Sequence, residues 1–330
     1  MSFITWNARG LGNQRAFREL KRLVAEKRPS ILFICETKMR DFQCSWWKHV
    51  LGFSGMFVVN CDGRRGGLML FWKEPLCVTI HSYTSGHIDS IIHHGNKKWR
   101  FNGFYGNPET QNRHLSWALL RRLSCMPEFK EYPWLVGGDF NKICFDREKL
   151  GGNPRPLSYT RAFREVLNAC SLPDLHGTGE YFTWVNRRSS DDIIFERLDR
   201  LVATLGWRLL YPADRVCSLE FYHSDHRPLL LDLRGQLQSA PQPNHLVRFE
   251  QHWVTETDFK DVVRMGWNKS DQAVTFPDRI KGCKENLRKW VGNRFGKLPK
   301  QIQGKRKNLN YLRTHDRWHT SVARISELER

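Results

Sequence analysis

HSDHRPLLLDL, residues 223–233, places polar and titratable side chains directly before an apolar run that is typical of a buried strand. The same pattern occurs at the ends of three other strand-like stretches, which are FITWN at 3–7, ILFICET at 31–37 and WLVGGDFN at 134–141. If these strands lie side by side, their polar residues converge at one rim, where a site forms without burying charge in the core.

The periodicity of the whole chain predicts a mixed α/β fold. Strands are expected at 3–6, 31–35, 56–60, 67–72, 76–80, 98–104, 134–137 and 228–233, and helices near 13–27, 111–125 and 158–169. The stretch from 67 to 104 has turn signals and no helical pattern, which indicates hairpins. We therefore expect a four-layer sandwich of two packed mixed β-sheets flanked by helices.

The formal charge is +19 over 330 residues. Such a field attracts polyanions, of which nucleic acid is the usual intracellular example, although a solvated basic surface without a partner is the alternative. The first ten residues, MSFITWNARG, have the pattern of a strand and turn, and no apolar run approaches the ~20 residues that cross a bilayer. We expect an intracellular protein with no membrane partner.

Composition changes after the last predicted strand. Residues 235–245 have the proline and glutamine content of a linker, so we predict a catalytic domain over 1–234 and a basic, mostly helical extension over 246–330. Residues 279–307 hold eleven basic side chains and one acidic side chain, Glu285. Breaks at Gly296, Pro299 and Gly304 favour two or three short helices. Their basic face either is solvated or contacts phosphates.

Each polar residue at a strand end has an ordinary explanation when it is taken alone, such as a turn or a cap. Together they supply the functional groups that phosphoester hydrolysis needs. Glu36 and Asn7 offer oxygen ligands for a divalent cation, and Asp139 with Asn141 can hold and deprotonate a water molecule.

The imidazole of His226 is the third functional group of this set, with Asp225 or Asp199 as its carboxylate partner. The ligand set is rich in oxygen and lacks clustered cysteine or histidine. It therefore favours Mg²⁺, with Mn²⁺ as a substitute, over zinc.

Seven short motifs occur in an order that resembles the endonuclease/exonuclease/phosphatase superfamily, and most of all the endonuclease domain of plant LINE-type (non-LTR) retrotransposons. The resemblance covers residues 1–234. The motifs are WNARG, ICET, Tyr105 in GFYGNP, GGDFN, Thr183 in YFTW, Asp199 in ERLDR, and HSDHRPL.

The resemblance implies roles for individual residues. Glu36, assisted by Asn7, would ligate the magnesium ion, with Asp225 in the metal neighbourhood. Asp139 would act on the attacking water, and Asn141 would orient that water.

Further roles follow from the same resemblance. His226, oriented by Asp199, would hydrogen-bond a phosphoryl oxygen, and Tyr105 would contact the phosphate or the leaving oxygen. Which residue is the base and which protonates the leaving group stays open at this stage.

Other residues are expected at the substrate. Ser224 would support its loop, and Lys142, where relatives often carry an acid, is interpreted as a surface substitution. The expected substrate-binding residues are Thr183, Ser224, Trp184, Arg64, Arg65, Arg187 and Arg188.

These features predict a Mg²⁺-dependent endonuclease that nicks one strand of double-stranded DNA and leaves a 3′-hydroxyl. No polymerase motif occurs, so the basic extension would be the region that precedes a reverse transcriptase and could contact element RNA. We expect a nuclear monomer. The alternatives are an abasic-site repair endonuclease, another phosphodiesterase of the superfamily, and a catalytically idle nucleic-acid-binding protein.

Overall fold

The computed structural model describes residues 1–175, 177–186, 193–233, 253–254, 256–268, 276–295, 301, 304–305 and 307–308. It divides into two compact units, Met1–Ala240 and Pro241–Arg330. The predicted linker, 235–245, lies outside the described residues, so its limits stay a prediction. Within the described ranges, no helix is long and apolar enough to cross a membrane.

The first unit contains a seven-stranded mixed sheet whose central strands are buried on both faces. Strand β1 runs parallel to β2 and antiparallel to β15, which carries the apolar run that follows HSDHRP. In sheet order the strands are β10 (Gly177–Gly179), β14 (Arg215–Ser218), β15 (Leu229–Asp232), β1 (Ser2–Asn7), β2 (Ile31–Cys35), β4 (Leu68–Trp72) and β3 (Gly55–Val59).

A second, five-stranded sheet packs against the first. Strands β7 and β8 are parallel, and the other neighbours are antiparallel. Its order is β13 (Asp199–Ala203), β8 (Trp134–Asp139), β7 (Lys97–Tyr105), β6 (His87–His94) and β5 (Cys77–Thr84). A small third sheet consists of β11 (Trp184–Val185), β12 (Phe195–Glu196) and β9 (Lys149–Leu150).

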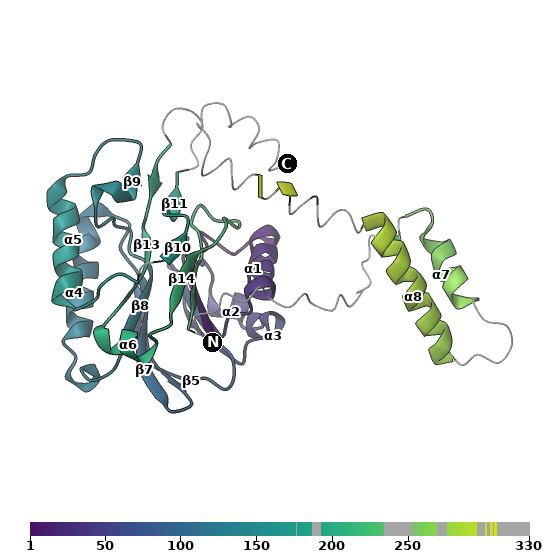
Figure 1. Cartoon of the computed structure of the whole chain (residues 1–330), viewed down its shortest axis with the longest axis horizontal. Coiled ribbons are helices and arrows are strands. Elements are labelled where there is room, and N and C mark those ends of the chain that lie inside the picture. Colours follow the sequence, from purple (N-terminus) through teal and green to yellow (C-terminus); the bar gives the residue numbers. More distant parts are fainter. Residues whose placement is uncertain are drawn as a thin grey trace. The chain divides into compact units, whose positions relative to one another are not determined.

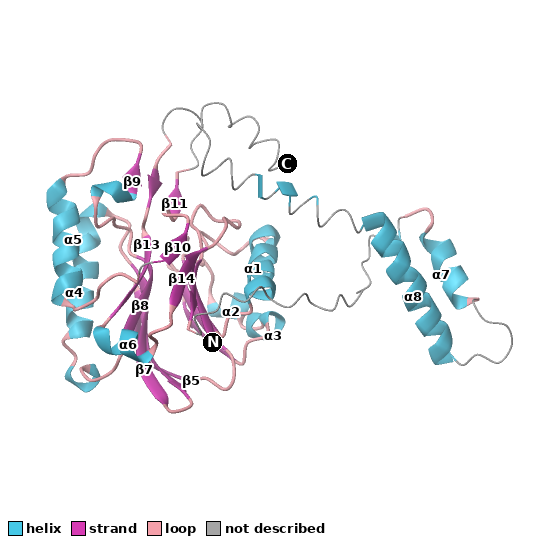
Figure 2. Cartoon of the chain, in the orientation of Figure 1, coloured by secondary structure: helices cyan, strands magenta, loops and turns pink. Residues whose placement is uncertain are grey.

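Helices cover the outer faces of the two large sheets (Figures 1 and 2). Apolar clusters join α1 and α3 to the first sheet, and α4 and α5 to the second. The predicted four-layer sandwich is therefore confirmed. The helices of this unit are α1 (Gln14–Lys27), α2 (Asp41–Cys44), α3 (Trp47–Leu51), α4 (Arg113–Ser124), α5 (Leu157–Ala169) and α6 (Leu205–Leu210), with single 3₁₀ turns at Thr110–Asn112, Pro127–Phe129 and Asp146–Glu148.

Aromatic side chains fill the space between the two sheets. The ring centroid of Phe101 lies 4.6 Å from that of Phe3 and 6.0 Å from that of Phe33. All three side chains are fully buried. Gly103 is required beside them, because a Cβ atom there would lie 2.3 Å from the ring of Phe33.

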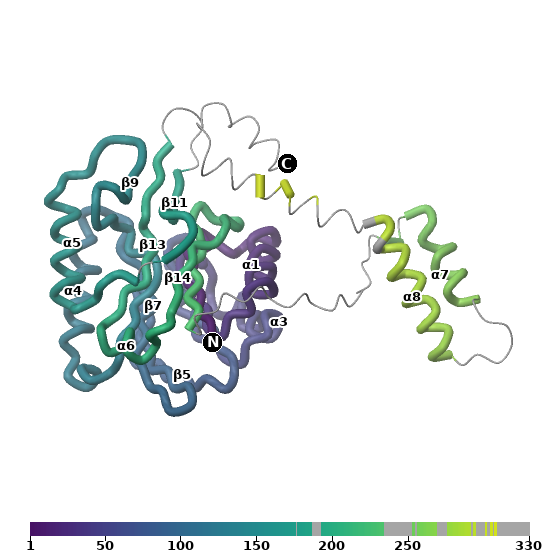
Figure 3. Tube along the Cα trace, viewed as in Figure 1, coloured from purple at the N-terminus to yellow at the C-terminus, as the bar shows by residue number. Residues whose placement is uncertain are grey.

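Strand direction brings the polar motifs to one rim. The ends of the parallel strands β1 and β2 are adjacent, and β15 begins where β1 ends because the two run in opposite directions. In the second sheet, Asp139 pairs with Tyr105 on one side and Asp199 on the other. Segments far apart along the chain thus lie side by side (Figure 3).

Strand β6 is an element that the periodicity did not predict. Its sequence, HIDSIIHH, places Asp89 and Ser90 at buried positions, so the apolar alternation is broken. The carboxylate of Asp89 accepts two hydrogen bonds from Arg100 on β7, at 2.9 and 2.7 Å. This cross-strand pairing of charges is not visible in a one-dimensional pattern.

The second unit contains a pair of helices, α7 (Phe259–Trp267) and α8 (Phe276–Phe295). Trp290 packs against Trp253 and Phe259, and its indole nitrogen donates to Asp258 at 2.7 Å. The predicted helical character of this region is found in α7 and α8. Helix α8 ends directly before the predicted break at Gly296, which lies outside the described residues.

We predict that Phe101→Ala destabilises the first unit by about 3–5 kcal/mol, because it removes a fully buried ring between the sheets. Phe42→Ala is the matched control, since Phe42 is 75% exposed, and we expect a change below about 0.5 kcal/mol. Urea unfolding followed by tryptophan fluorescence measures both. Equal unfolding midpoints for the two variants would contradict this account of the core.

Candidate active site

The side-chain amide of Asn7 connects the two sheets at the rim. Its Nδ2 atom donates to Oδ2 of Asp139 at 2.8 Å and to Oε1 of Glu36 at 3.1 Å. Its Oδ1 atom accepts from the backbone N–H of Arg9 at 3.0 Å, which fixes the orientation of the amide. Asn7 is fully buried, so these bonds are shielded from water.

Glu36 follows β2 in a left-handed backbone conformation, with φ of 51°. Its Oε1 atom also accepts from the hydroxyl of Tyr105 at 2.9 Å. Burial, reinforced by the carboxylates of Glu36 and Asp139, raises the pKa of Tyr105, so the phenol stays a neutral donor.

A divalent cation fits this corner of the site. No described residue donates to Oε2 of Glu36, and Glu36 lines a cleft of about 870 Å³. An open carboxylate oxygen facing solvent is the ligand type that magnesium prefers.

Asp139 ends β8 and is fully buried. Its Oδ1 atom accepts from the backbone N–H of Asn141 at 2.7 Å. Burial raises the pKa of Asp139 and repulsion from Asp199 adds to this, while His226 and the two hydrogen bonds act in the opposite direction without cancelling the rise. A buried carboxyl group with a raised pKa can exchange protons near neutral pH.

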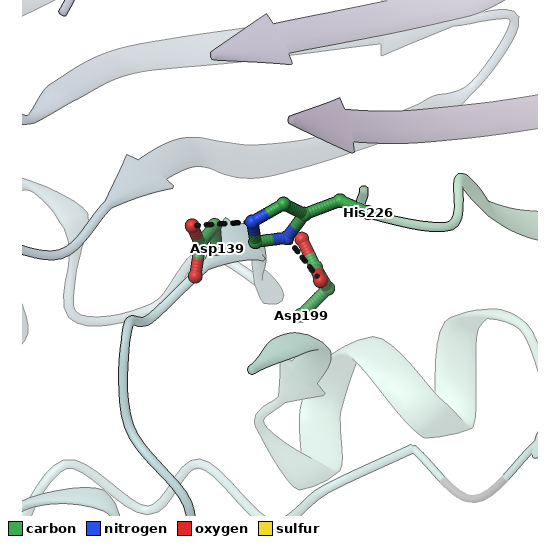
Figure 4. Close-up of side chains that lie close together, drawn as sticks. All are labelled: Asp139, Asp199 and His226. Carbon is green, nitrogen blue, oxygen red and sulfur yellow. Dashed lines mark hydrogen bonds and ion pairs between the residues drawn. The ribbon is translucent and has the colours of Figure 1, made fainter. Parts of the chain in front are cut away.

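His226 lies between two carboxylates (Figure 4). Its Nδ1 atom is 2.9 Å from Oδ2 of Asp199, and its Nε2 atom is 3.9 Å from Oδ2 of Asp139. Burial lowers the pKa of His226, but Asp199 and Asp139 outweigh burial and raise the pKa to about 8. The imidazole is therefore mainly protonated at neutral pH, with its Nε2 side turned toward Asp139.

Asp139, Asp199 and His226 each offer one ligand atom, and these atoms lie within 4.8 Å of one another. By distance alone, this group could also hold a metal ion. However, Nδ1 of His226 is engaged with Asp199, whereas Glu36 keeps an oxygen open to the cleft. Glu36 is thus the better placed cation ligand.

Two residues that are expected at the substrate, Thr183 and Ser224, hydrogen-bond to the backbone of their neighbours. Thr183 is 2% exposed, and its hydroxyl accepts from the backbone N–H groups of Leu198 and Asp199, both at 3.0 Å. Ser224 is also 2% exposed, and its hydroxyl accepts from the N–H of His226 at 3.0 Å. These bonds hold the backbone at His226 and Asp199, as expected of Ser224 for its loop, and the substrate contacts of both residues stay predictions.

Asp225, which is expected in the metal neighbourhood, has three partners in its surroundings. Its Oδ2 atom accepts from the guanidinium of Arg9 and from the indole nitrogen of Trp184, the latter at 3.0 Å. Its Oδ1 atom faces the hydroxyl of Ser224 at 3.4 Å. Arg9 pairs with this carboxylate and Trp184 donates to it, while the place of Asp225 near a metal ion stays a prediction. The sequence signal for Arg9 is its position two residues after Asn7 in the WNARG motif.

The cleft beside Glu36 and Tyr105 is lined with both basic and acidic residues. Arg64 and Arg65, which are expected to contact phosphate, lie in it with Lys38 and Arg122, and so do Asp62 and Glu109. Arg65 forms an exposed ion pair with Glu109 at 3.1 Å. The other predicted pair, Arg187 and Arg188, lies outside the described residues.

Lys142 differs from its interpretation as a surface substitution. The residue is only 2% exposed, and its Nζ atom lies 4.8 Å from the centroid of the Tyr159 ring. The tertiary fold of α5 over the loop after Asn141 causes this burial, which no local sequence pattern reveals.

The two-sheet sandwich and its rim of carboxylates, amide and imidazole define a hydrolase-type site. The sequence matches the endonuclease/exonuclease/phosphatase family over residues 4–226. The chain belongs to this family, a class of nucleases and phosphatases, and the predicted resemblance is confirmed at this level.

Solved structures agree with this fold. The chain is similar to the endonuclease domain of TRAS1, a telomere-specific non-LTR retrotransposon, with 15% identity, a TM-score of 0.53, and 71% of this chain and 98% of that chain covered. It is also similar to the AP endonuclease LMAP from Leishmania major, with 17% identity, a TM-score of 0.54, and 70% and 86% covered. A third similar structure is the 3′ phosphatase NExo from Neisseria bound to a product DNA hairpin, with 17% identity, a TM-score of 0.52, and 70% and 98% covered.

At these identities the similarity establishes the fold alone. No curated protein sequence matches the chain.

We predict that Asp199→Asn lowers the pKa of His226 by more than about one unit from its value near 8. The substitution removes the charge beside Nδ1 but keeps the ring buried, so burial then dominates. An NMR titration of the imidazole measures the change, and the signal missing in His226→Gln identifies the residue. An unchanged pKa would show that Asp199 does not stabilise the imidazolium.

Proposed function

We propose that the chain is a magnesium-dependent endonuclease that nicks one strand of double-stranded DNA and leaves a 3′-hydroxyl, as expected of a retrotransposon-type enzyme. The observation that carries this proposal is the convergence of Glu36, Asn7, Asp139 and the His226–Asp199 pair beside a cleft that contains four basic side chains. This arrangement combines proton transfer with binding of an anionic substrate.

His226 acts as a donor to the phosphoryl group. Its pKa near 8 keeps Nε2 protonated, and Asp199 holds Nδ1, so the ring cannot rotate away. An imidazolium in a buried site stabilises the negative charge that grows on a phosphoryl oxygen.

Asp139 accepts the proton of the attacking water. Its raised pKa suits it for this role, and Asn141 holds one carboxylate oxygen in place through its backbone N–H. Asn141 is itself anchored, since its Nδ2 atom donates to the carbonyl oxygen of Gly106 at 2.7 Å. Tyr105 remains a neutral hydroxyl near the leaving oxygen.

Glu36, oriented by Asn7 and Tyr105, would hold the magnesium ion. When bound, this ion supplies Lewis-acid stabilisation of the phosphoryl charge. Mn²⁺ has the same ligand preferences and would substitute for it.

The choice of DNA rests on charge and on the relatives. The cleft contains Arg64, Arg65, Lys38 and Arg122, and the chain carries a formal charge of +19. The similar structures are described as a retrotransposon endonuclease, an AP endonuclease, and a 3′ phosphatase bound to DNA. A DNA substrate also supports a nuclear location.

The basic side chains of α8 would add a second phosphate-contacting surface, for DNA or for element RNA. They include Arg279, Lys281, Lys284, Arg288, Lys289 and Arg294.

We predict that purified protein converts supercoiled plasmid to open circles with magnesium and not with EDTA. Asp139→Asn and His226→Gln should each lower the rate at least about 100-fold, because each removes a group that transfers or donates a proton. The matched control is Arg161→Gln, which changes an exposed side chain on α5 and should keep full activity.

Circular dichroism must show that the variants are folded. Plasmid nicking that survives both substitutions would contradict the assigned roles. Cleavage confined to duplexes that contain an abasic site would instead identify a repair endonuclease, and binding without any cleavage would identify a nucleic-acid-binding protein.

The nicking rate should also fall as the pH rises through about 8, because deprotonation of His226 removes the Nε2 donor while Nδ1 stays with Asp199. In Asp199→Asn this alkaline limb should move to lower pH, since the imidazole then loses its proton earlier. Single-turnover rates between pH 6 and 10 measure the profile. An alkaline limb at the same pH in both proteins would assign it to another group.

A further inference from the structure

A cluster of basic side chains lies behind the loop that carries Asp139 and Asn141. Lys142 follows Asn141 directly and is 2% exposed. Its ammonium group lies over one face of the Tyr159 ring, 4.8 Å from the centroid. The Nζ atom donates no hydrogen bond to any part of the chain that the structure describes. A cation–π contact uses one side of an ammonium group, so the N–H donors of Lys142 find no protein acceptor among the described residues and are left to water.

Arg113, the first residue of α4, has the same deficit. Its Nη2 atom donates to the carbonyl oxygen of Pro108 at 3.2 Å. Its Nε and Nη1 atoms are buried, and neither finds a partner among the described residues. Buried guanidinium nitrogens without acceptors are costly in free energy, so a group that supplies acceptors would be stabilised here.

The nearby charges do not compensate for Lys142 and Arg113. Arg155 is a third cation, and both oxygens of Glu196 accept from it, at 2.9 and 2.7 Å. Lys149 adds a further cation 3.9 Å from Glu196. The cluster therefore has an excess of positive charge around one buried carboxylate.

The electrostatics of the cluster support this description. Burial lowers the pKa of Lys142 to about 8, with help from Arg113 and Arg155. The pKa of Arg113 is also lowered, first by burial and then by Arg155, while Glu196 and Asp139 act in the opposite direction. Because Arg113 senses the charge of Asp139, the cluster lies within electrostatic range of the catalytic loop.

We propose that Arg113 and Lys142 form a binding site for one backbone phosphate of the DNA strand, adjacent to the phosphate that is cleaved. A phosphate oxygen would accept from the unpaired nitrogens of Arg113 and from the ammonium group of Lys142, and its charge would offset theirs. The inference rests on the proposed function, because it takes the substrate to be a nucleic-acid strand. A terminal phosphate has the same oxygen chemistry, so the test has to separate the two sources.

The first measurement is the salt dependence of DNA binding by the full chain, in EDTA so that no cleavage occurs. Loss of one phosphate contact lowers the slope of log affinity against log salt by about one. We expect this change, with affinity about five- to tenfold weaker, in Arg113→Gln/Lys142→Gln. The exposed control Arg161→Gln should change neither quantity. Lys142→Met, which keeps the apolar stem over Tyr159, is a second variant if the double variant does not fold.

The second measurement replaces single phosphates of the duplex with neutral methylphosphonates, one position at a time. In the wild-type protein, one position next to the nick should weaken binding about five- to tenfold. In the double variant, the methylphosphonate at that position should not weaken binding further, because the side chains that contact the phosphate are absent. Equal losses in both proteins at every position would overturn the proposal.

Nicked duplexes with a 5′-phosphate or a 5′-hydroxyl separate the two sources of phosphate. Equal affinity for the two ends supports a site for a backbone phosphate. Tighter binding of the 5′-phosphate by the wild-type protein, lost in the double variant, would overturn the proposal.

Failure of the site and failure of the proposed function are distinguishable. Wild-type protein that nicks plasmid, combined with an unchanged salt slope and methylphosphonate profile in the variants, refutes the phosphate site alone. Wild-type protein that neither binds nor nicks DNA refutes both.

Discussion

The amide of Asn7 is the interaction on which the site depends. One nitrogen atom donates to Glu36, which follows a strand of the first sheet, and to Asp139, which ends a strand of the second. Two carboxylates that would otherwise repel each other are thereby held at a fixed separation. The backbone N–H of Arg9 fixes the orientation of the Asn7 amide. The distance between the two sheets and the distance between the catalytic groups are therefore set together. A shift in the packing of the sheets would alter the chemistry directly.

Charge balance is the second constraint at this rim. Asp139 and Asp199 are both buried, and burial, reinforced by repulsion from Asp199, raises the pKa of Asp139. His226 relieves part of that repulsion by lying between them as a cation. The side chains of Thr183 and Ser224 add neutral hydrogen bonds that hold this arrangement without adding charge. The site thus keeps two carboxylates in a small buried volume because an imidazolium separates them.

The sequence predicts the parts of this site that depend on strand direction. Polar residues at the ends of parallel neighbouring strands meet at one edge of a sheet, and this rule brings Asn7 and Glu36 together. Asp139 joins them from the second sheet, so its approach also depends on how the two sheets pack. The rule does not predict side-chain partners, which are set by packing across several elements. The pairing of Arg9 with Asp225 and the burial of Lys142 beneath Tyr159 are of this kind. Strand β6 was not predicted for the same reason, since the burial of Asp89 depends on its ion pair with Arg100.

The basic residues near the catalytic groups form two sets that are held differently. Arg64 and Arg65 lie in an open cleft, where water and ions compete for them. Lys142 is 2% exposed and two guanidinium nitrogens of Arg113 are buried, so an anion that reaches this pair meets donors that are already partly desolvated. Exposed cations attract a strand from a distance and bind it weakly, whereas enclosed cations act only at contact and depend on geometry. On the proposed function, the side chains of the cleft would attract the DNA, and Arg113 with Lys142 would set the position of the strand. Phosphate contacts of this kind can place a nick at a defined phosphate although they do not recognise bases.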